Sequence, residues 1–171
     1  LIVATDDKRI AESVLSFGGN VVMTKSDHST GTSRCLEAYR KWKIKDNNDA
    51  SIIINIQGDE PLLNPLHIEQ LIHCFNDPRT TMSTVALKVK SGDLLHEGKV
   101  YLTKNDEDFA IYFSRYPIPY IRDVSKEKWS SLHQYYQHIG IYGFKSDALE
   151  KFANMNESLL EKAEKLEQLR W

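Results

Sequence analysis

Two adjacent carboxylates, Asp59 and Glu60, follow directly after the apolar segment 52–56 and a short turn that contains a glycine. A short, β-branched apolar run of this kind predicts a strand buried on both faces, as in a parallel sheet. Ligands of open α/β sheets bind beyond the carboxyl ends of the strands, and Mg²⁺ binds through one or two carboxylates together with water and substrate phosphates. Asp59 is therefore a candidate metal ligand next to a phosphate-bearing substrate, although acids are also common in plain turns.

Gln57 precedes Asp59 by two residues. Both side chains lie on the same face if the strand continues, because side chains alternate along a strand. The Gln57 amide could therefore donate to a substrate hydroxyl. Glu60 points away by the same alternation, which favours a structural role for it.

The polar loop 27–34 is a second candidate region, and it contains Gly31, Thr32 and Arg34. A glycine among small hydroxyl residues lets a ligand approach the backbone, and the loop leads into a predicted helix N-terminus, which favours anions. The full phosphate-loop spacing is missing, so an ordinary loop is the simpler alternative. Arg115 follows a predicted strand and could bind a carboxylate or phosphate bidentately, but taken alone it is typical of an exposed arginine.

His138 and Tyr142 are four residues apart on a predicted strand, so they share a face. Gly140 lies between them and leaves space on that face, which favours a pocket wall over an ordinary core position. Glu167 and Gln168 lie beside the apolar stripe of a predicted final helix, where charged residues usually face solvent. That stripe is predicted to contain Leu159, Ala163, Leu166 and Leu169.

The bulk composition is ordinary. The chain has 171 residues, 41% of them hydrophobic, a mean hydropathy of −0.46 and a net charge of −2. We expect one domain with a real core. Neither nucleic acid nor a membrane is an expected partner, because there is no basic excess and no apolar segment long enough to cross a bilayer. The isolated cysteines, Cys35 and Cys74, form no metal-ligand spacing and predict packing roles in a reducing compartment.

Hydrophobic periodicity predicts alternating strands and helices in the first half of the chain. The strands are predicted at 1–5, 21–23 and 51–56, and the helices near 7–17, 35–42 and 65–75. This order is typical of a mostly parallel sheet between two helical layers, a three-layer α/β/α arrangement. The second half is predicted to hold strands at 82–89, 100–103, 109–113 and 138–144, a polar, mobile excursion at 121–134, and helices at 146–155 and 158–171.

Motifs in a fixed order give a more specific indication. They include Gln57-Gly58-Asp59-Glu60-Pro61, Tyr112-Phe113-Ser114-Arg115, His138-Ile139-Gly140-Ile141-Tyr142 and Leu166-Glu167-Gln168-Leu169-Arg170. With these motifs, nearly the whole chain resembles the 3-deoxy-manno-octulosonate (Kdo) cytidylyltransferases, also called CMP-Kdo synthetases.

The resemblance implies transfer of CMP from CTP to Kdo with release of pyrophosphate and a requirement for Mg²⁺, in the cytoplasm and for lipopolysaccharide synthesis. It implies a nucleotide-diphospho-sugar-transferase-like sheet in one domain, 1–171, whose residues 1–80 bind the nucleotide and whose residues 81–171 bind the sugar and form a homodimer. By the same resemblance, the catalytic residues are Asp59, which is also the metal ligand, Gln57 and Arg115. The substrate-binding residues that it implies are Arg34, Gly31 and Thr32 on the nucleotide side and His138, Tyr142, Glu167 and Gln168 on the sugar side.

Two features of the family have no counterpart in the sequence: a triphosphate-binding loop expected before Leu1 and a further metal-binding Asp expected after Trp171. We therefore interpret the chain as incomplete at both ends, and we expect these residues alone to be inactive or nearly so. The alternatives are a CMP-sialate synthetase, another sugar nucleotidylyltransferase of the same fold, or a non-catalytic nucleotide-binding homologue. A metal-dependent glycosyltransferase is a weaker option, because its two acids would be separated by one residue.

Overall fold

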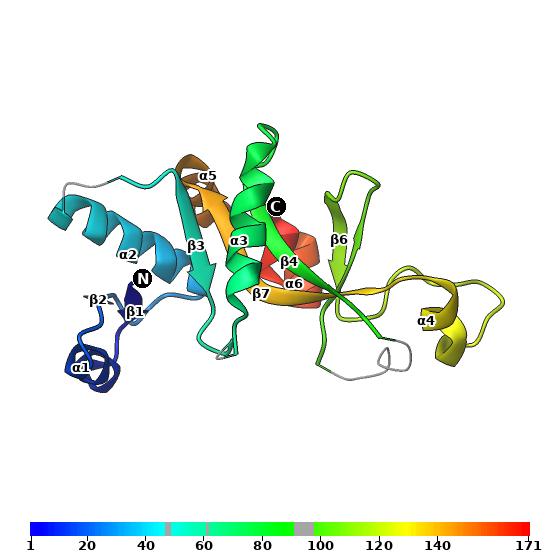
Figure 1. Ribbon diagram of the computed structural model, residues 1–171, viewed down its shortest axis with the longest axis horizontal. Coiled ribbons are helices and arrows are strands. Elements are labelled where there is room, and N and C mark those ends of the chain that lie inside the picture. The colour runs from blue at the N-terminus through cyan, green and yellow to red at the C-terminus, as the bar shows by residue number, and fades with distance from the viewer. Residues whose placement is uncertain (47–48, 61, 91–97) are drawn as a thin grey trace.

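The computed structural model describes residues 1–46, 49–60, 62–90 and 98–171 (Figure 1). Pro61 of the first motif lies outside the described residues. The strands are β1 (Val3–Thr5), β2 (Val21–Met23), β3 (Ile52–Ile56), β4 (Met82–Lys88), β5 (Tyr101–Lys104), β6 (Ala110–Ser114) and β7 (Tyr136–Lys145). The α-helices are α1 (Lys8–Ser16), α2 (Gly31–Asp46), α3 (Pro65–His73), α4 (Trp129–Leu132), α5 (Ser146–Ala153) and α6 (Leu159–Glu164).

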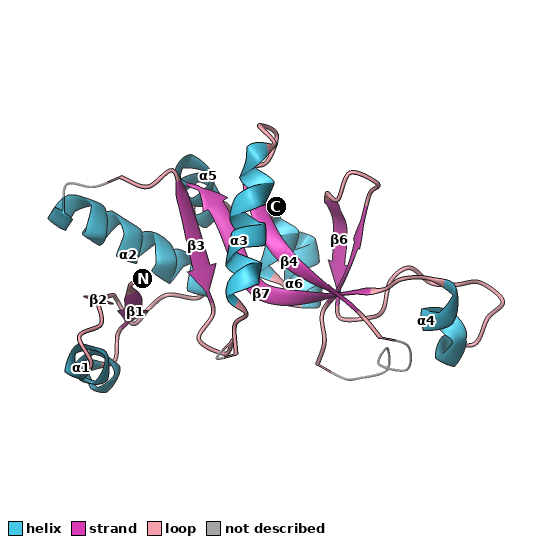
Figure 2. Cartoon of the chain, in the orientation of Figure 1, coloured by secondary structure: helices cyan, strands magenta, loops and turns pink. Residues whose placement is uncertain are grey.

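Two sheets carry the described fold (Figure 2). β1 and β2 form a parallel pair. The larger sheet has the order β3-β7-β5-β6, and β4 also pairs with β7. Tyr142 of β7 lies opposite both Asn55 of β3 and Thr84 of β4, so β3 and β4 occupy opposite edges of β7.

The predicted α/β class is confirmed, but the mostly parallel pairing is not, because the pairings in the larger sheet are antiparallel. β3 and β4 do run parallel to each other, as expected for two strands joined by a helix, since both are antiparallel to β7. β7 lies between them, however, and comes from much later in the chain. Local periodicity cannot reveal a strand inserted from so distant a part of the sequence.

Helices cover both faces of the larger sheet, which accounts for the predicted three layers. α3 lies on one face (Figure 1), where Leu71 packs against Val85 and Ile141. α2 and α5 lie on the opposite face, whose core contains Leu36, Tyr39, Tyr142, Phe144, Leu149 and Phe152. None of the helices in the described ranges is both long and apolar enough to cross a membrane.

Local signals in the sequence explain where two of these helices begin. The Asp7 side chain accepts a hydrogen bond from the Arg9 N–H at the start of α1, and Asn64 caps α3 through the N–H of Leu66. Pro65 takes the first helical position of α3, where its missing N–H has no cost. The predicted start of α3 at Pro65 is confirmed, and α1 begins at Lys8, one residue after its predicted start.

A small second core supports the end of the molecule that carries α4. Trp129 is 2% exposed, its ring stacks on Tyr135 with the centroids 6.3 Å apart, and its indole N–H donates to the carbonyl of Val124 (2.9 Å). The segment 121–134, expected to be a polar, mobile excursion, is instead folded around this buried tryptophan. The large aromatic area of a single tryptophan is enough to anchor an otherwise polar segment.

Periodicity predicted that the final helix runs to Trp171, but it ends at Glu164. Lys165 has φ +53° and ψ +46°, in the left-handed region, where a helix commonly ends. The 3₁₀ turn η4 (Glu167–Arg170) follows this reversal. A helix end that falls on a lysine in this conformation gives no glycine or proline signal in the sequence.

The reversal changes which side chains of this segment are buried. Leu166 packs against Leu102 of β5 and Phe113 of β6. Leu159, in contrast, is 84% exposed, and Ala163 is exposed as well. The predicted inward stripe is therefore wrong for Leu159 and Ala163, because it assumed one continuous helix.

These burial differences predict a contrast between two leucines. Leu149 is 0% exposed, so Leu149→Ala should lower the free energy of unfolding by about 2–5 kcal/mol through the cavity it leaves. Leu159→Ala removes the same atoms from the surface and should change the free energy of unfolding by less than about 0.5 kcal/mol. Urea denaturation followed by circular dichroism measures both values. Equal losses from the two substitutions would contradict the described course of α6.

Candidate functional site

A cavity of about 450 Å³ lies beside β7. It lies in the gap between β3 and β5, which pair with different parts of the same edge of β7. β3 ends opposite Ile141, and β5 begins opposite Gln137. Ile139 and Gly140 lie between these points and line the cavity. The cavity thus lies at the carboxyl end of β3, where the sequence predicted a site. The predicted site residues that line it are Gly31, Gln57, Asp59, His138, Tyr142, Glu167 and Gln168.

Gln57 is held against the first residue of α2. A Cβ atom on Gly31 would lie 2.7 Å from Gln57 Nε2 and 2.8 Å from Gln57 Oε1, closer than real side chains approach. Glycine at this position therefore lets the amide of Gln57 lie directly on the helix N-terminus. This contact joins the end of β3 to the start of α2, two regions that no pattern in the sequence connects.

The Asp59 turn places one carboxylate outward and one inward. The Glu60 N–H donates to the carbonyl of Gln57 (3.1 Å), which closes the turn. Glu60 Oε1 accepts a hydrogen bond from the N–H of Gly140 on β7 (3.3 Å). This bond agrees with the structural role expected for Glu60. Its carboxylate nevertheless faces the cavity, because the turn interrupts the alternation of side chains that was assumed for a continuing strand. Asp59 is exposed at the mouth of the cavity.

His138 is buried and neutral in this environment. Its Nε2 lies 2.9 Å from Thr84 Oγ1, and the Thr84 hydroxyl also lies 2.8 Å from the carbonyl of Ile141. If the single hydroxyl proton goes to this carbonyl, the hydroxyl oxygen accepts from Nε2–H, which assigns the tautomer. Burial lowers the pKa of His138 to about 4. Nδ1 is then the unprotonated ring nitrogen and can accept a hydrogen bond, and His138 is one of the residues that line the cavity.

Tyr142 shares the wall with His138, as the shared face predicted, with ring centroids 5.4 Å apart. Burial raises the pKa of the Tyr142 hydroxyl, and the nearby Glu167 carboxylate adds to the effect. The phenol therefore stays protonated and remains a hydrogen-bond donor. Gly140 lies between His138 and Tyr142 in the cavity wall, where a Cβ atom would lie 3.4 Å from Gln57 Cγ.

Glu167 connects the end of the chain to the start of α2. Thr32 Oγ1 donates to Glu167 Oε2 (3.0 Å), and Thr32 is 1% exposed. Burial raises the pKa of Glu167, which the hydroxyl of Thr32 partly offsets. The hydroxyl of Thr32 therefore faces Glu167 and does not line the cavity.

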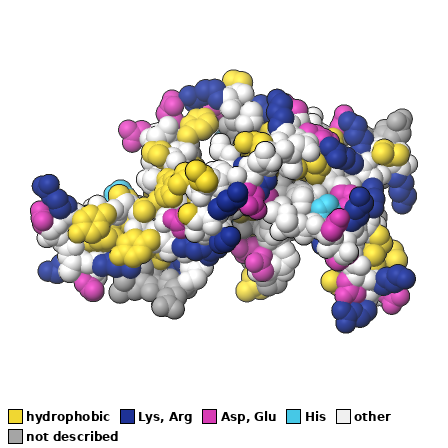
Figure 3. Space-filling model, turned by 180° about the vertical axis from the view of Figure 1, so that it is seen from behind, with side chains coloured by type: hydrophobic (Ala, Val, Ile, Leu, Met, Phe, Trp, Pro, Cys, Tyr) yellow, Lys and Arg dark blue, Asp and Glu magenta, His cyan; other side chains and the backbone are white. Residues whose placement is uncertain are grey.

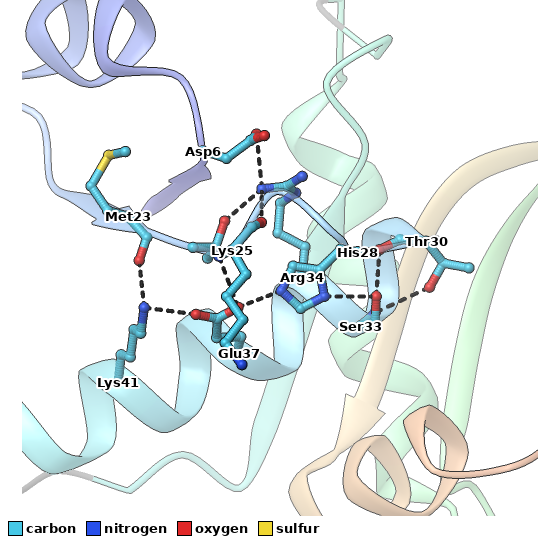
Figure 4. Close-up of polar contacts among 10 residues, drawn as sticks. Asp6, Met23, Lys25, His28, Thr30, Ser33, Arg34, Glu37 and Lys41 are labelled. Carbon is cyan, nitrogen blue, oxygen red and sulfur yellow. Dashed lines mark hydrogen bonds and ion pairs between the residues drawn. The ribbon is translucent and has the colours of Figure 1, made fainter.

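Arg34 lies in the first turn of α2, because this helix begins at Gly31, inside the segment 27–34 that was predicted as a loop. Its side chain is directed toward Asp6 (Figure 4). Arg34 does not line the cavity. Its Nη1 donates to Thr24 Oγ1 (2.6 Å) and to the carbonyl of Lys25 (3.1 Å), and it lies 3.0 Å from Asp6 Oδ1. These contacts tie the loop to the end of β1. A role for Arg34 in nucleotide binding stays a prediction.

A second set of contacts fixes the same loop from α2 (Figure 4). His28 contacts Ser33 Oγ through Nδ1 (3.0 Å) and the Glu37 carboxylate through Nε2. Lys41 lies 2.7 Å from Glu37, and Lys41 together with His28 lowers the pKa of that carboxyl to about 2. The loop before α2 is therefore a structured element and not a free surface loop.

Arg115 also lies outside the cavity lining. Its Nε donates to the carbonyl of Glu164 (2.6 Å), and its Nη2 donates to the carbonyl of Lys165 (2.9 Å). Its backbone N–H donates to Glu164 Oε2 (2.9 Å). Arg115 thus stabilises the backbone reversal at Lys165, next to the residues that line the cavity.

Two cationic residues of the cavity wall, Lys99 and Lys165, were missed by sequence reasoning. They offset the carboxylates of Asp59, Glu60 and Glu167 in the same wall. Lys165 reaches the cavity because of the backbone reversal, and Lys99 because it precedes β5. A weak signal for Lys165 was its position directly before the Leu166–Arg170 motif.

Comparison with known proteins agrees with this geometry. Residues 1–171 match the family model described as cytidylyltransferase. The 3-deoxy-manno-octulosonate cytidylyltransferase of Parabacteroides distasonis is 44% identical, covering 99% of this chain and 68% of the relative, and that of Escherichia coli is 38% identical, covering 98% and 64%. The structure of a CMP:2-keto-3-deoxy-manno-octonic acid synthetase complexed with CTP has a TM-score of 0.83 and 36% identity, covering 99% of this chain and 66% of that chain. The chain thus spans about two thirds of the length of these relatives.

The fold and the matched family define a nucleotidyltransferase of the cytidylyltransferase class. Within that class, the chain belongs to the family of 3-deoxy-manno-octulosonate cytidylyltransferases. The resemblance inferred from the sequence motifs is confirmed. The CMP-sialate synthetase alternative is not favoured by these relatives.

The buried His138 predicts a pH dependence of stability. Its folded pKa of about 4 lies below the value of about 6.5 for an unfolded histidine. The unfolded chain therefore binds more protons between these values, and stability is lost as the pH falls through them, by about 3 kcal/mol in total.

Urea denaturation at pH 7.5, 6 and 4.5 measures this loss. We expect His138→Gln to remove this component of the slope. The matched variant His73→Gln, at an exposed position, should keep it. A His138→Gln slope identical to that of the unchanged protein would contradict burial of a neutral histidine.

Proposed function

We propose that this chain takes part in the transfer of CMP from CTP to Kdo, which releases pyrophosphate and yields CMP-Kdo for lipopolysaccharide synthesis. Support comes first from the family to which the chain belongs. The observation that carries the assignment of the sugar site is the shared cavity. It unites the strand-end residues Gln57 and Asp59 with His138, Tyr142 and the turn at Glu167.

In the proposed reaction, the anomeric hydroxyl oxygen of Kdo forms a bond to the α-phosphorus of CTP. The bond from that phosphorus to the bridging oxygen breaks, pyrophosphate leaves with the electron pair, and the hydroxyl proton passes to solvent. Such transfers need positioning and neutralisation of charge more than covalent help from the protein. The chain's own residues are suited to positioning, since His138 Nδ1 accepts while Tyr142 and Gln57 donate hydrogen bonds.

We propose that the sugar carboxylate is bound in a cavity whose wall also contains Lys99 and Lys165. Without these cations, an acid sugar would meet mainly the carboxylates of Asp59, Glu60 and Glu167. Arg115 supports the same region through its bonds to the backbone of Lys165. Gly31, Thr32 and Arg34 are proposed for the nucleotide side, where the start of α2 offers backbone N–H groups to phosphate.

We propose Mg²⁺ as the cofactor, with Asp59 as its protein ligand. The donor set fits, because Mg²⁺ is usually bound through one or two carboxylates and completed by water and substrate phosphates. Across the described ranges, no group of three or more His, Cys, Asp or Glu residues could hold a metal ion alone, so substrate phosphates would complete the site. When bound, the ion would neutralise phosphate charge.

A homodimer and a cytoplasmic location complete the proposal. Hydrophobic side chains gather at the surface of the end that carries α4 (Figure 3). The exposed members near this end include Tyr116 and Tyr120, whose rings contact Trp129, and Leu132 of α4. An exposed apolar patch of this kind is typical of a protein–protein contact. The nucleotide substrate and the free cysteines Cys35 and Cys74 are consistent with a reducing, CTP-containing compartment.

Pyrophosphate release with CTP and a panel of acid sugars tests the proposed function. The protein is used at its full natural length, because this chain spans about two thirds of its relatives. We expect turnover with Kdo and little with nine-carbon acid sugars. Turnover with a nine-carbon sugar and none with Kdo would contradict the substrate assignment.

Asp59→Asn should abolish most of the activity while the protein stays folded. The substitution keeps the size of an exposed side chain but removes the proposed metal-binding charge, so we expect turnover to fall by at least about 100-fold. Asp106→Asn, at another exposed acid in the β5–β6 turn, is the matched control and should keep the activity. Turnover of Asp59→Asn equal to that of the control would support a non-catalytic role for the turn.

A further inference from the structure

Two of the proposed sugar-binding residues, Glu167 and Gln168, lie on a turn whose own hydrogen bonds are too few to fix its position. η4 has four residues, and short 3₁₀ segments have poor hydrogen-bond geometry. The reversal at Lys165 separates this turn from α6, so the helix does not orient it directly. Contacts elsewhere must therefore fix the two side chains in the cavity wall.

One of these contacts is a buried ion pair at the C-terminal end of the turn. Arg170 Nε lies 2.8 Å from Glu161 Oε2, and Arg170 Nη2 lies 2.5 Å from Glu161 Oε1. Both side chains are 8% exposed. The guanidinium also lies over the ring of Phe152, 5.1 Å from its centroid. A bidentate pair of this kind fixes orientation as well as distance.

Glu161 is itself fixed by the start of α6. Its N–H donates to Ser158 Oγ (3.0 Å), and its Oε2 accepts from the Ser158 N–H (3.3 Å), which together form a capping box. The Ser158 hydroxyl also contacts the carbonyl of Leu169 (3.3 Å). The carboxylate of Glu161 therefore joins the first turn of α6 to the last residues of η4.

We propose, building on the proposed function, that Arg170 is a positioning residue for the acid-sugar site. It does not line the cavity itself. Through Glu161 it holds η4 so that Glu167 stays bonded to Thr32 and Gln168 faces the cavity. Glu161 is its partner in this role. The pair acts on the sugar side of the site, because the contact that it holds uses the hydroxyl of Thr32, whereas the proposed phosphate contact of Thr32 is its backbone N–H at the start of α2.

A purely structural role would have a different signature. Removing one partner of a buried ion pair leaves an unpaired charge and destabilises the whole fold, which would affect both substrates together. A positioning role changes sugar binding in a protein that remains folded, because displacement of a binding group by about 1 Å is enough to impair a site. The KM values for the two substrates therefore distinguish the two roles.

Arg170→Lys is the first test, made in the protein at its full natural length. Lysine keeps the charge but cannot make the bidentate contact. We expect the KM for Kdo to rise by about 10–100-fold, as is typical when the support of a binding residue is lost, while the KM for CTP stays unchanged. The control is Arg40→Lys, because Arg40 makes a similar two-nitrogen contact with Glu150 between α2 and α5, and it should change neither value.

The double substitution Glu161→Met/Arg170→Met is the second test. Replacing both partners of a buried ion pair by apolar residues often preserves stability, so we expect a melting temperature near that of the unchanged protein and a raised KM for Kdo. In its crystal structure, the Thr32–Glu167 contact of 3.0 Å should be lost.

Two results would overturn the positioning role. One is a folded Arg170→Lys variant with an unchanged KM for Kdo, and the other is a double variant whose crystal structure keeps the Thr32–Glu167 contact. Failure of the unchanged protein to use CTP and Kdo would instead refute the proposed function, and the crystal structure would still decide the role of Arg170.

Discussion

The placement of β7 is the constraint on which the rest of the structure depends. One edge of β7 pairs first with β5 and then with β3, and its other edge pairs with β4 along most of its length. The cavity lies where β5 and β3 diverge, so its floor is β7 itself and its sides are the ends of two other strands. His138 and Tyr142 reach the cavity because they lie on this strand, and Gln57 reaches it because β3 ends there.

Much of the local structure could be predicted from the sequence because its causes are local. The cap at Asn64, the apolar run of β3 and the turn between β5 and β6 each depend on a few neighbouring residues. The pairing of β7 and the reversal at Lys165 could not be predicted in the same way. Both depend on contacts between segments far apart in the chain, and neither leaves a periodic or compositional signal.

The candidate site shows the same division. The family motifs identified Gln57, His138 and Gln168, and the fold brings these residues to one cavity. Arg115 was also identified, but its guanidinium binds backbone carbonyls at the reversal. Lys99 also lines the cavity, although it belongs to none of the family motifs. Residue type and spacing therefore indicated which segments meet, whereas the direction of each long side chain depended on which carbonyl or carboxylate lay nearest in the fold.

The hydrogen bond between Thr32 and Glu167 has a consequence for how the protein acquires its site. The two residues are 135 positions apart, and contacts of such long range form slowly because a large loop must close first. During synthesis, the start of α2 leaves the ribosome long before its partner on η4 exists. The cavity is therefore completed late in folding, after the last of these residues has been added, so the proposed acid sugar cannot stabilise a nascent chain before that point.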